Sequence, residues 1–282
     1  MNKTKRIRSV VAVMLSFLLS VCIVAMAGSL VLRNTVLSGS YAKKTVSSCD
    51  LGEKKSEELK TQLVSYGNAC NIGEDFFDEF FKNTLTTTFI ENDLKAYYNG
   101  IFYGGNAKVD TAQLERLLKE ALIKYAEENG YSDEETLEED VELIAGEMGE
   151  IYSGVLSLPG ASKISSVILK TRDYIDIVMY VSSCAVMVAT FMLTFMFKPK
   201  TYSTRYLIYG WSGACLMLLA APLYLRVTNL IGKVNIVSKA LYSFVVAFGT
   251  GVLNAFIISA CACAAVTAVL SLIYIRLSKK AE

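Results

Sequence analysis

Carboxylate side chains are the groups in this 282-residue sequence with the most obvious capacity for chemistry. They are densest at 133–140 and at 74–79. Converging carboxylates can hold a hard cation such as calcium, and a pair of them can hydrolyse a glycosidic bond. Neither cluster has the Asp-x-Asp-x-Asp-Gly spacing of a calcium loop, and neighbouring residues on a helix point in different directions. We therefore expect solvated helix faces, with no metal site and no cofactor.

Histidine is absent from the chain, which excludes Ser-His-Asp catalysis, Cys-His catalysis and histidine-ligated zinc. The sequence also lacks Gly-x-x-x-x-Gly-Lys-Ser/Thr and Gly-x-Ser-x-Gly, the motifs of phosphate binding and of a nucleophile elbow. Ser40 and Lys43 fit Ser-x-x-Lys, but the companion motifs of that enzyme class are missing. We expect no catalytic residue and no enzymatic activity.

Four uncharged apolar runs must organise the chain, at 9–32, 177–197, 206–225 and 244–275. At 1.5 Å per residue, a helix of about 20 residues crosses the roughly 30 Å of a bilayer's hydrocarbon core. Each run reaches that length, and hydrophobic residues make up 53% of the chain. The sequence therefore predicts four transmembrane spans.

The segment 33–176 between the first two runs has a different composition. It carries 26 of the 27 acidic residues against 15 basic ones, a formal charge of −11, while the rest of the chain carries +12. Apolar residues recur at helical spacing over 53–68, 74–89, 91–102, 113–128 and about 132–155. A last helix from about 162 is expected to continue into the second span. The segment is therefore predicted to be a separate, all-helical domain.

The positive charges predict the orientation. The tail 1–8, the turn 198–205 and the tail 276–282 are basic, which favours the cytoplasmic side. The domain 33–176 and the loop 226–243 then lie outside, although that loop contains Arg226, Lys233 and Lys239. We predict an all-α, four-span helical protein of the plasma (cell) membrane, multi-pass, N-in and C-in, with an all-helical extracytoplasmic domain between spans 1 and 2. Alternatively, 9–32 is a signal peptide cleaved after Ala27, which leaves three spans.

Two of the seven cysteines, Cys49 and Cys70, fall in the predicted outer domain. An oxidising compartment would favour a disulfide between them, which would tie the start of the domain to the end of its first helix. The two thiols would stay reduced where no oxidase acts on them. The sequence is compatible with both states.

Small residues form a helix-packing stripe in the fourth span, where they recur every four positions. The stripe consists of Ala247, Gly251, Ala255, Ser259, Cys263, Thr267 and Ser271. Such a row lets a second helix approach closely. Gly210, Gly213 and Ala214 in the third span offer a counterpart, so one interpretation is packing of spans 3 and 4. The other is a seam for a separate membrane partner.

In span order alone, the chain resembles the permease subunits of the cell-division and macrolide-exporter class of ABC transport systems. The resemblance implies a transport-related subunit that contacts an ATPase, although the turn 198–205 is shorter than the cytoplasmic elements of those permeases. We favour a non-catalytic membrane protein whose outer helical domain binds or senses a partner. Its expected partners are the lipid bilayer and a protein outside or within the membrane, whereas the acidic domain argues against nucleic acid.

Overall fold

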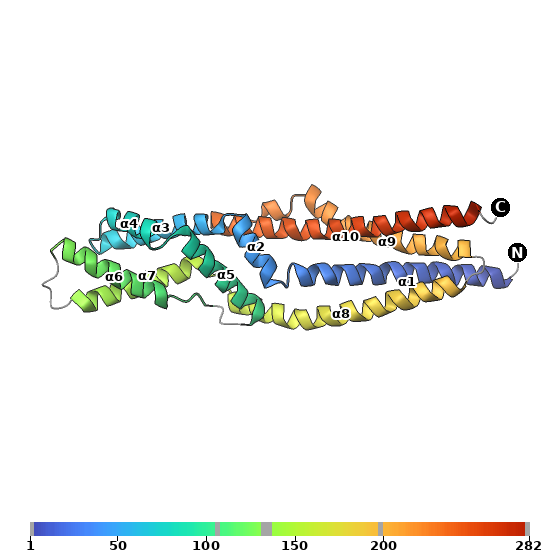
Figure 1. Ribbon diagram of the computed structural model, residues 1–282, viewed down its shortest axis with the longest axis horizontal. Helices are drawn as coiled ribbons and strands as arrows, with labels where there is room; N and C mark the ends of the chain where they lie inside the picture. The colour runs from blue at the N-terminus through green and yellow to red at the C-terminus, as the bar shows by residue number, and fades with distance from the viewer. Residues whose placement is uncertain (1–2, 105–107, 131–136, 197–199, 280–282) are drawn as a thin grey trace. The chain divides into compact units, whose positions relative to one another are not determined.

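The computed structural model describes residues 3–104, 108–130, 137–196 and 200–279. Helix accounts for 88% of the structure, and the described residues include no strand, which confirms the all-α prediction. In chain order the helices are α1 (Lys3–Asn34), α2 (Gly39–Ser48), α3 (Leu51–Ala69), α4 (Glu74–Asn83), α5 (Thr87–Tyr103), α6 (Ala112–Glu128), α7 (Leu137–Leu156), α8 (Ala161–Met196), α9 (Lys200–Val227), the 3-10 turn η1 (Ile231–Lys233) and α10 (Lys239–Lys279) (Figure 1).

Four stretches are long and apolar enough to cross a membrane: Ile7–Asn34, Ala161–Met196, Lys200–Lys233 and Lys239–Lys279. They support a multi-pass membrane protein. Helix α8 runs unbroken from Ala161 to Met196, which confirms that the last helix of the acidic segment continues into the second apolar run. Helix α10 begins at Lys239, where Ser238 caps it, and it contains the whole apolar run 244–275. The other predicted segment limits stay predictions.

The chain forms two compact units. The first, which we call the span unit, comprises residues 1–38, 170–234 and 248–282. The second, which we call the acidic unit, comprises residues 39–169 and 235–247, and it contains 24 of the chain's 27 acidic residues. Helices α8 and α10 each contribute residues to both units.

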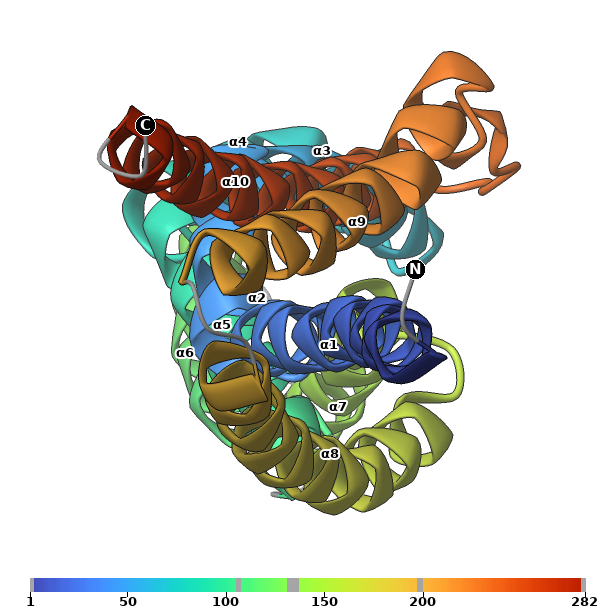
Figure 2. The same cartoon turned by 90° about the vertical axis from the view of Figure 1, so that its right-hand side faces the viewer.

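In the span unit, α9 lies between α1 and α10, and α8 lies on the other side of α1 (Figure 2). Gly210 of α9 packs directly on α1, because a Cβ there would come within 2.7 Å of Leu19. Its carbonyl also accepts a hydrogen bond of 2.8 Å from the Ser20 hydroxyl of α1. The core of the unit is a cluster of mostly small or branched residues: Ala12, Leu19, Ile23, Ala189, Leu193, Ala214, Leu218, Ala260 and Cys263.

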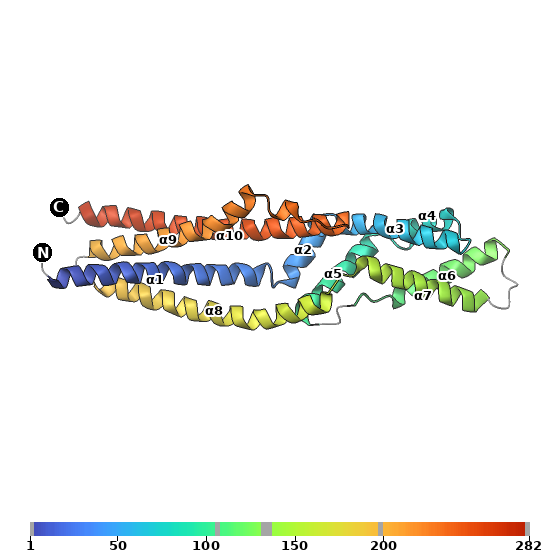
Figure 3. The same ribbon diagram turned by 180° about the vertical axis from the view of Figure 1, so that it is seen from behind.

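The acidic unit is built around α3, which contacts α4, α5 and α7, while α6 pairs with α7 (Figure 3). Amphipathic spacing explains this arrangement, because Leu59 and Leu63 share one face of α3 and both are fully buried. Gly67 completes that face: the Phe77 ring of α4 occupies the space that a Cβ would need. A larger residue at 67 would therefore separate α3 from α4.

Two helix boundaries differ from the prediction. The single helix expected over 74–89 ends at Asn83, and α5 starts at Thr87. Thr86 caps α5, since its hydroxyl oxygen accepts a hydrogen bond of 3.4 Å from the Phe89 amide. The short helix α2 was not predicted, because its buried residues Ala42, Thr45 and Val46 are too few to give a periodic signal.

Candidate functional site

The densest group of polar contacts that joins distant parts of the chain surrounds the start of α10. Ser238 precedes the helix, and its hydroxyl oxygen accepts a hydrogen bond of 3.1 Å from the Leu241 amide. The hydroxyl donates in turn to Glu58 of α3, with a distance of 2.8 Å to Oε1. The same carboxylate oxygen lies 3.4 Å from the Ala240 amide. Glu58 therefore satisfies backbone donors that the first turn of a helix leaves free, and its charge suits the positive end of the helix dipole.

Two lysines complete this group, which we call the α10 joint (Lys54, Lys55, Glu58, Ser238 and Ser243). Lys55 lies 2.8 Å from Glu58, and its side chain is only 10% exposed. The Lys54 ammonium donates to the Ser243 hydroxyl and to the Cys49 carbonyl, at 3.0 Å each. One apolar contact accompanies the joint: the rings of Phe244 and Tyr98 are 4.7 Å apart. The start of α10 is thus held on α3 by charge and hydrogen bonds and on α5 by one aromatic pair.

The joint sets the protonation of its carboxylate. Partial burial pushes the pKa of Glu58 upward, but the hydrogen bonds from Lys55 and Ser238 outweigh burial and leave the pKa below its usual value. Glu58 is therefore ionised at neutral pH and paired with Lys55. Each charged group of the joint already has a partner, so the arrangement suits a structural connection better than acid–base chemistry.

A second polar contact in the acidic unit joins α5 to α7, and sequence reasoning missed it. Tyr152 is fully buried, and its hydroxyl donates to Asp93 Oδ2 at 2.6 Å. Burial raises the pKa of Asp93, and the negative charge of Asp110 adds to this, although the hydrogen bond from Tyr152 opposes it. Nearby, the Tyr97 hydroxyl accepts a hydrogen bond of 2.8 Å from the Leu158 amide. Helical spacing shows which face is buried but not which distant side chain it meets, so the sequence alone held no signal for this pair.

An ion pair in the span unit connects the end of α1 with α8. Arg33 Nε lies 3.3 Å from Asp176 Oδ1, an ionic contact without the direction of a good hydrogen bond. Arg172 of α8 also donates to the Leu37 carbonyl at 2.8 Å. These contacts hold the end of α1 and the residues that follow it against α8.

The described residues of the two carboxylate clusters lie in α4 and α7. Glu138 and Glu139 are exposed in the first turn of α7, where acidic residues favour the helix dipole, whereas 133–135 lie outside the described residues. In the other cluster, Asp78 of α4 pairs with Lys60 of α3, and Glu79 accepts a hydrogen bond from Asn83. Among the residues that the structure describes, no three ligand-type side chains converge on a point that could hold a metal ion.

The structure separates Cys49 from Cys70, for which the sequence allowed either a disulfide or two free thiols. Both thiols are free, and they flank opposite ends of the 19-residue helix α3. At 1.5 Å per residue this helix is roughly 28 Å long, whereas a disulfide needs Cα atoms within about 7 Å. Burial also raises the pKa of the Cys49 thiol, which lowers its thiolate content and its reactivity.

The small-residue stripe of α10 has one fully packed member. Cys263 is buried in the core cluster of the span unit, and the remaining members in the span unit are half-buried. The stripe hydroxyls donate within their own helix, for example Thr267 to the Cys263 carbonyl at 2.9 Å. Of the three residues expected as a counterpart in the third span, Gly210 and Gly213 pack on α1, whereas Ala214 is buried in the same cluster as Cys263 of α10. Whether the stripe receives a partner stays a prediction.

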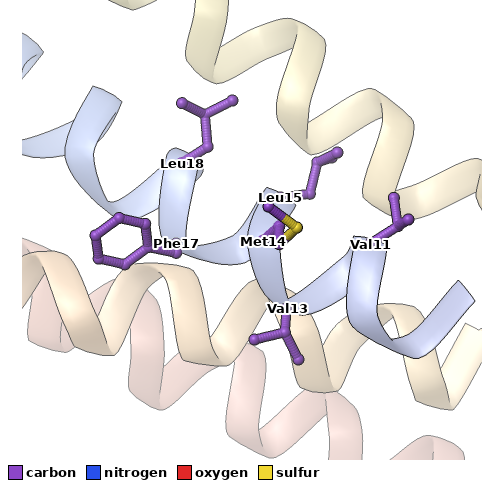
Figure 4. Close-up of a pocket in the computed structure, with 6 residues that line it drawn as sticks. All are labelled: Val11, Val13, Met14, Leu15, Phe17 and Leu18. Atoms are coloured by element: carbon purple, nitrogen blue, oxygen red, sulfur yellow. The ribbon is translucent and has the colours of Figure 1, made fainter. Parts of the chain in front are cut away.

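An apolar hollow lies along α1 in the span unit (Figure 4). Its volume is about 660 Å³, and it is lined by Val11, Val13, Met14, Leu15, Phe17 and Leu18. These side chains offer no hydrogen-bond donor or acceptor, so the hollow suits hydrocarbon and cannot orient a polar substrate.

Comparison with known proteins found no matching family model, no match among curated proteins and no match among solved structures.

Proposed function

We propose that the chain is a non-catalytic integral protein of the plasma (cell) membrane, N-in and C-in, whose acidic unit lies outside the cell and binds or senses a protein partner. One observation carries the proposal: two of the four apolar helices begin in the acidic unit. Residues 161–169 of α8 and 239–247 of α10 belong to that unit, and the rest of each helix belongs to the span unit. Because a continuous helix moves as a rigid element, a change in the acidic unit can reach the spans.

The α10 joint supports this transmission. Glu58 of α3 accepts hydrogen bonds from the Ser238 hydroxyl and the Ala240 amide at the start of α10, and Lys54 of α3 donates to Ser243. Several hydrogen bonds thus connect α3 to the start of α10. A partner that shifts α3 would therefore carry the start of α10 with it.

The surface of the acidic unit supports a protein partner. Its excess of acidic residues favours a partner with a basic patch, which would also speed association. Large apolar side chains are exposed beside this charge, including Leu143 of α7 at 65% and Val167 of α8. Exposed apolar residues surrounded by charge are typical of interaction sites.

Photo-crosslinking in native membranes tests the proposal. A photoreactive residue at position 143 is expected to give a specific protein adduct, while the same residue at position 124, an exposed lysine of α6, is expected to give none. A reporter fused after Gly130 is expected to be accessible from outside the cell. A cytosolic reporter, or the absence of any adduct at 143, would overturn the proposal. Co-purification of a cytoplasmic ATPase would favour the transport-related alternative.

A further inference from the structure

The residues at and after the end of α9 combine exposed apolar side chains with exposed cations. Val227, Leu230 and Val234 are exposed, at 85%, 46% and 42%, and the neighbouring cations Arg226 and Lys233 are exposed as well. No acidic residue occurs from 177 to 281, so this part of the sequence offers these cations no carboxylate. We call residues 226–234 the interfacial segment.

The interfacial segment has a defined backbone. The Asn229 amide donates to the Arg226 carbonyl at 3.2 Å, and the Leu230 amide donates to the Leu225 carbonyl at 3.3 Å. Asn229 itself adopts a left-handed conformation with φ of 48°, which asparagine tolerates better than most residues. The exposed side chains are therefore held on one ordered turn instead of being averaged over a random loop.

The contact of Ile231 with α10 shows which part of that helix the segment lies beside. Its side chain packs on Gly249, where a Cβ would come within 3.0 Å of Ile231 Cδ1. Gly249 is ten residues after the first residue of α10, which corresponds to about 15 Å of helix. The segment thus lies beside the part of α10 that belongs to the span unit.

The exposed apolar face of α9 reaches the end of that helix. Leu223 and Tyr224 are exposed on its last turns, Val227 follows them at helical spacing, and Leu230 is exposed in the turn beyond the helix. A surface that faces lipid along α9 therefore reaches the segment, where the first cations appear. Apolar side chains at the acyl boundary with Lys and Arg at headgroup level are the pattern of a membrane-interface contact.

We propose that the interfacial segment docks on anionic phospholipid headgroups of the bilayer that its own spans cross. Val227, Leu230 and Val234 enter the boundary between headgroups and acyl chains. Arg226 and Lys233 bind the phosphate groups beside them, Arg through its planar guanidinium fork and Lys as a compact charge. The positive charge of this loop, which opposes the orientation bias of the other basic segments, then serves lipid binding.

Tryptophan fluorescence of the full chain, reconstituted in phospholipid vesicles, tests this. The chain has one tryptophan, so W211F removes it and L230W places a new one in the segment. Brominated phosphatidylglycerol and brominated phosphatidylcholine then report, by quenching, which headgroup surrounds residue 230. We expect quenching by both lipids and a preference for phosphatidylglycerol. Adding R226Q and K233Q should lower that preference about fivefold for each cation, the ratio equivalent to about 1 kcal/mol.

The matched control changes two cations at the other end of α10, R276Q with K279Q, and should leave the preference at residue 230 unchanged. A second probe, V234W in the W211F background, repeats the measurement at another position in case the L230W variant does not fold. The docking would be overturned if acrylamide, a water-soluble quencher, quenched the tryptophan at position 230 and brominated lipid did not. Equal quenching by the two lipids would overturn the headgroup selection.

Discussion

The two units of this chain differ in the side chains that they bury. In the acidic unit the enclosed residues are large, such as Phe77 and Tyr152, which are fully buried. In the span unit the fully buried residues include Ala214 and Ala260, while Phe17 lies on the surface with 62% of its area exposed. Among the described residues, the buried aromatic rings belong to the acidic unit, whereas the buried residues of the span unit are aliphatic, small or polar.

This difference indicates that the acidic unit is surrounded by water and the span unit by the hydrocarbon of a membrane. In water, burying apolar area gains about 25 cal/mol for each Å², so large side chains belong inside. In hydrocarbon this gain vanishes, and helices associate through close packing of small residues and through hydrogen bonds. The contact of Gly210 with Leu19 and the hydrogen bond from Ser20 to the Gly210 carbonyl are interactions of the second kind. This contrast makes the comparison testable residue by residue.

The largest effect is expected from Phe77→Ala. The ring is fully buried between α3 and α4 and makes an edge contact with Phe76 at 5.1 Å. Its loss leaves a cavity that should cost about 3–5 kcal/mol of the acidic unit's stability. Hydrogen exchange of α3 and α4 in the full chain measures this change. Phe17→Ala in the span unit is the control, and we expect less than a tenth of that cost in a bilayer.

A large loss of stability from Phe17→Ala would break the comparison, because it would mean that the exposed face of α1 is covered by protein. The hollow lined by that side chain would then be the place to look for the covering element. An unchanged hydrogen-exchange pattern in Phe77→Ala would contradict the enclosed core of the acidic unit.

Gly210→Leu should have the next largest effect, in the opposite unit. The added side chain collides with Leu19 and forces α9 away from α1. Overpacking of this kind typically lowers stability by about 1–3 kcal/mol. Thermal unfolding of the reconstituted protein measures the loss. Ala220→Leu, at an exposed position of the same helix, is the matched control and should have no effect. Equal destabilisation by both substitutions would mean that small size matters all along α9.

The sequence predicted the helical class, four apolar runs and the continuity of α8, because length and period are local properties. It could not predict that Gly210 packs on α1, since a small-residue row shows where a helix can approach but not which helix does so. The same limit explains the error at 74–89. The apolar period continues across Thr84–Thr86, and the cap by Thr86 becomes evident only once α5 is seen to turn away.

The α10 joint was beyond sequence reasoning for a related reason. Glu58 and Ser238 are 180 positions apart, and each has an ordinary local role, one on a helix face and one before a helix. Their pairing follows from the placement of the start of α10 beside α3, where Phe244 also packs on Tyr98 of α5.

Glu58→Gln is expected to loosen the start of α10 by a smaller amount. The amide still accepts hydrogen bonds but lacks the charge that pairs with Lys55. At a partly exposed site, losing that charge should reduce stability by about 1 kcal/mol. Hydrogen-exchange protection over 239–243 should fall about fivefold. Because the folded pKa of Glu58 lies below its usual value of 4.5, its stabilising contribution is present above that value and is lost as the pH falls through the folded pKa.

Wild-type protein should therefore lose protection at the start of α10 in acid, while the Glu58→Gln variant should show no such pH dependence. Glu142→Gln removes the exposed pair with Lys119 and is the matched control, expected to leave α10 unchanged. A pH dependence that persists in Glu58→Gln would assign the titration to another group and weaken the role of the joint.

The smallest effect is expected at the two outer cysteines, where a closed disulfide would have been worth roughly 3 kcal/mol. Because α3 holds Cys49 and Cys70 at its opposite ends, reductant should change neither the stability nor the number of thiols that react in the denatured chain. Cys70→Ser is the control, and it should lower that number by one with or without reductant. A bridge within one chain could form only if α3 unwound, which would also release Phe77 from Gly67 and mimic the largest effect above. A bridge between two chains would instead appear as a reducible dimer, with the hydrogen-exchange protection of α3 unchanged.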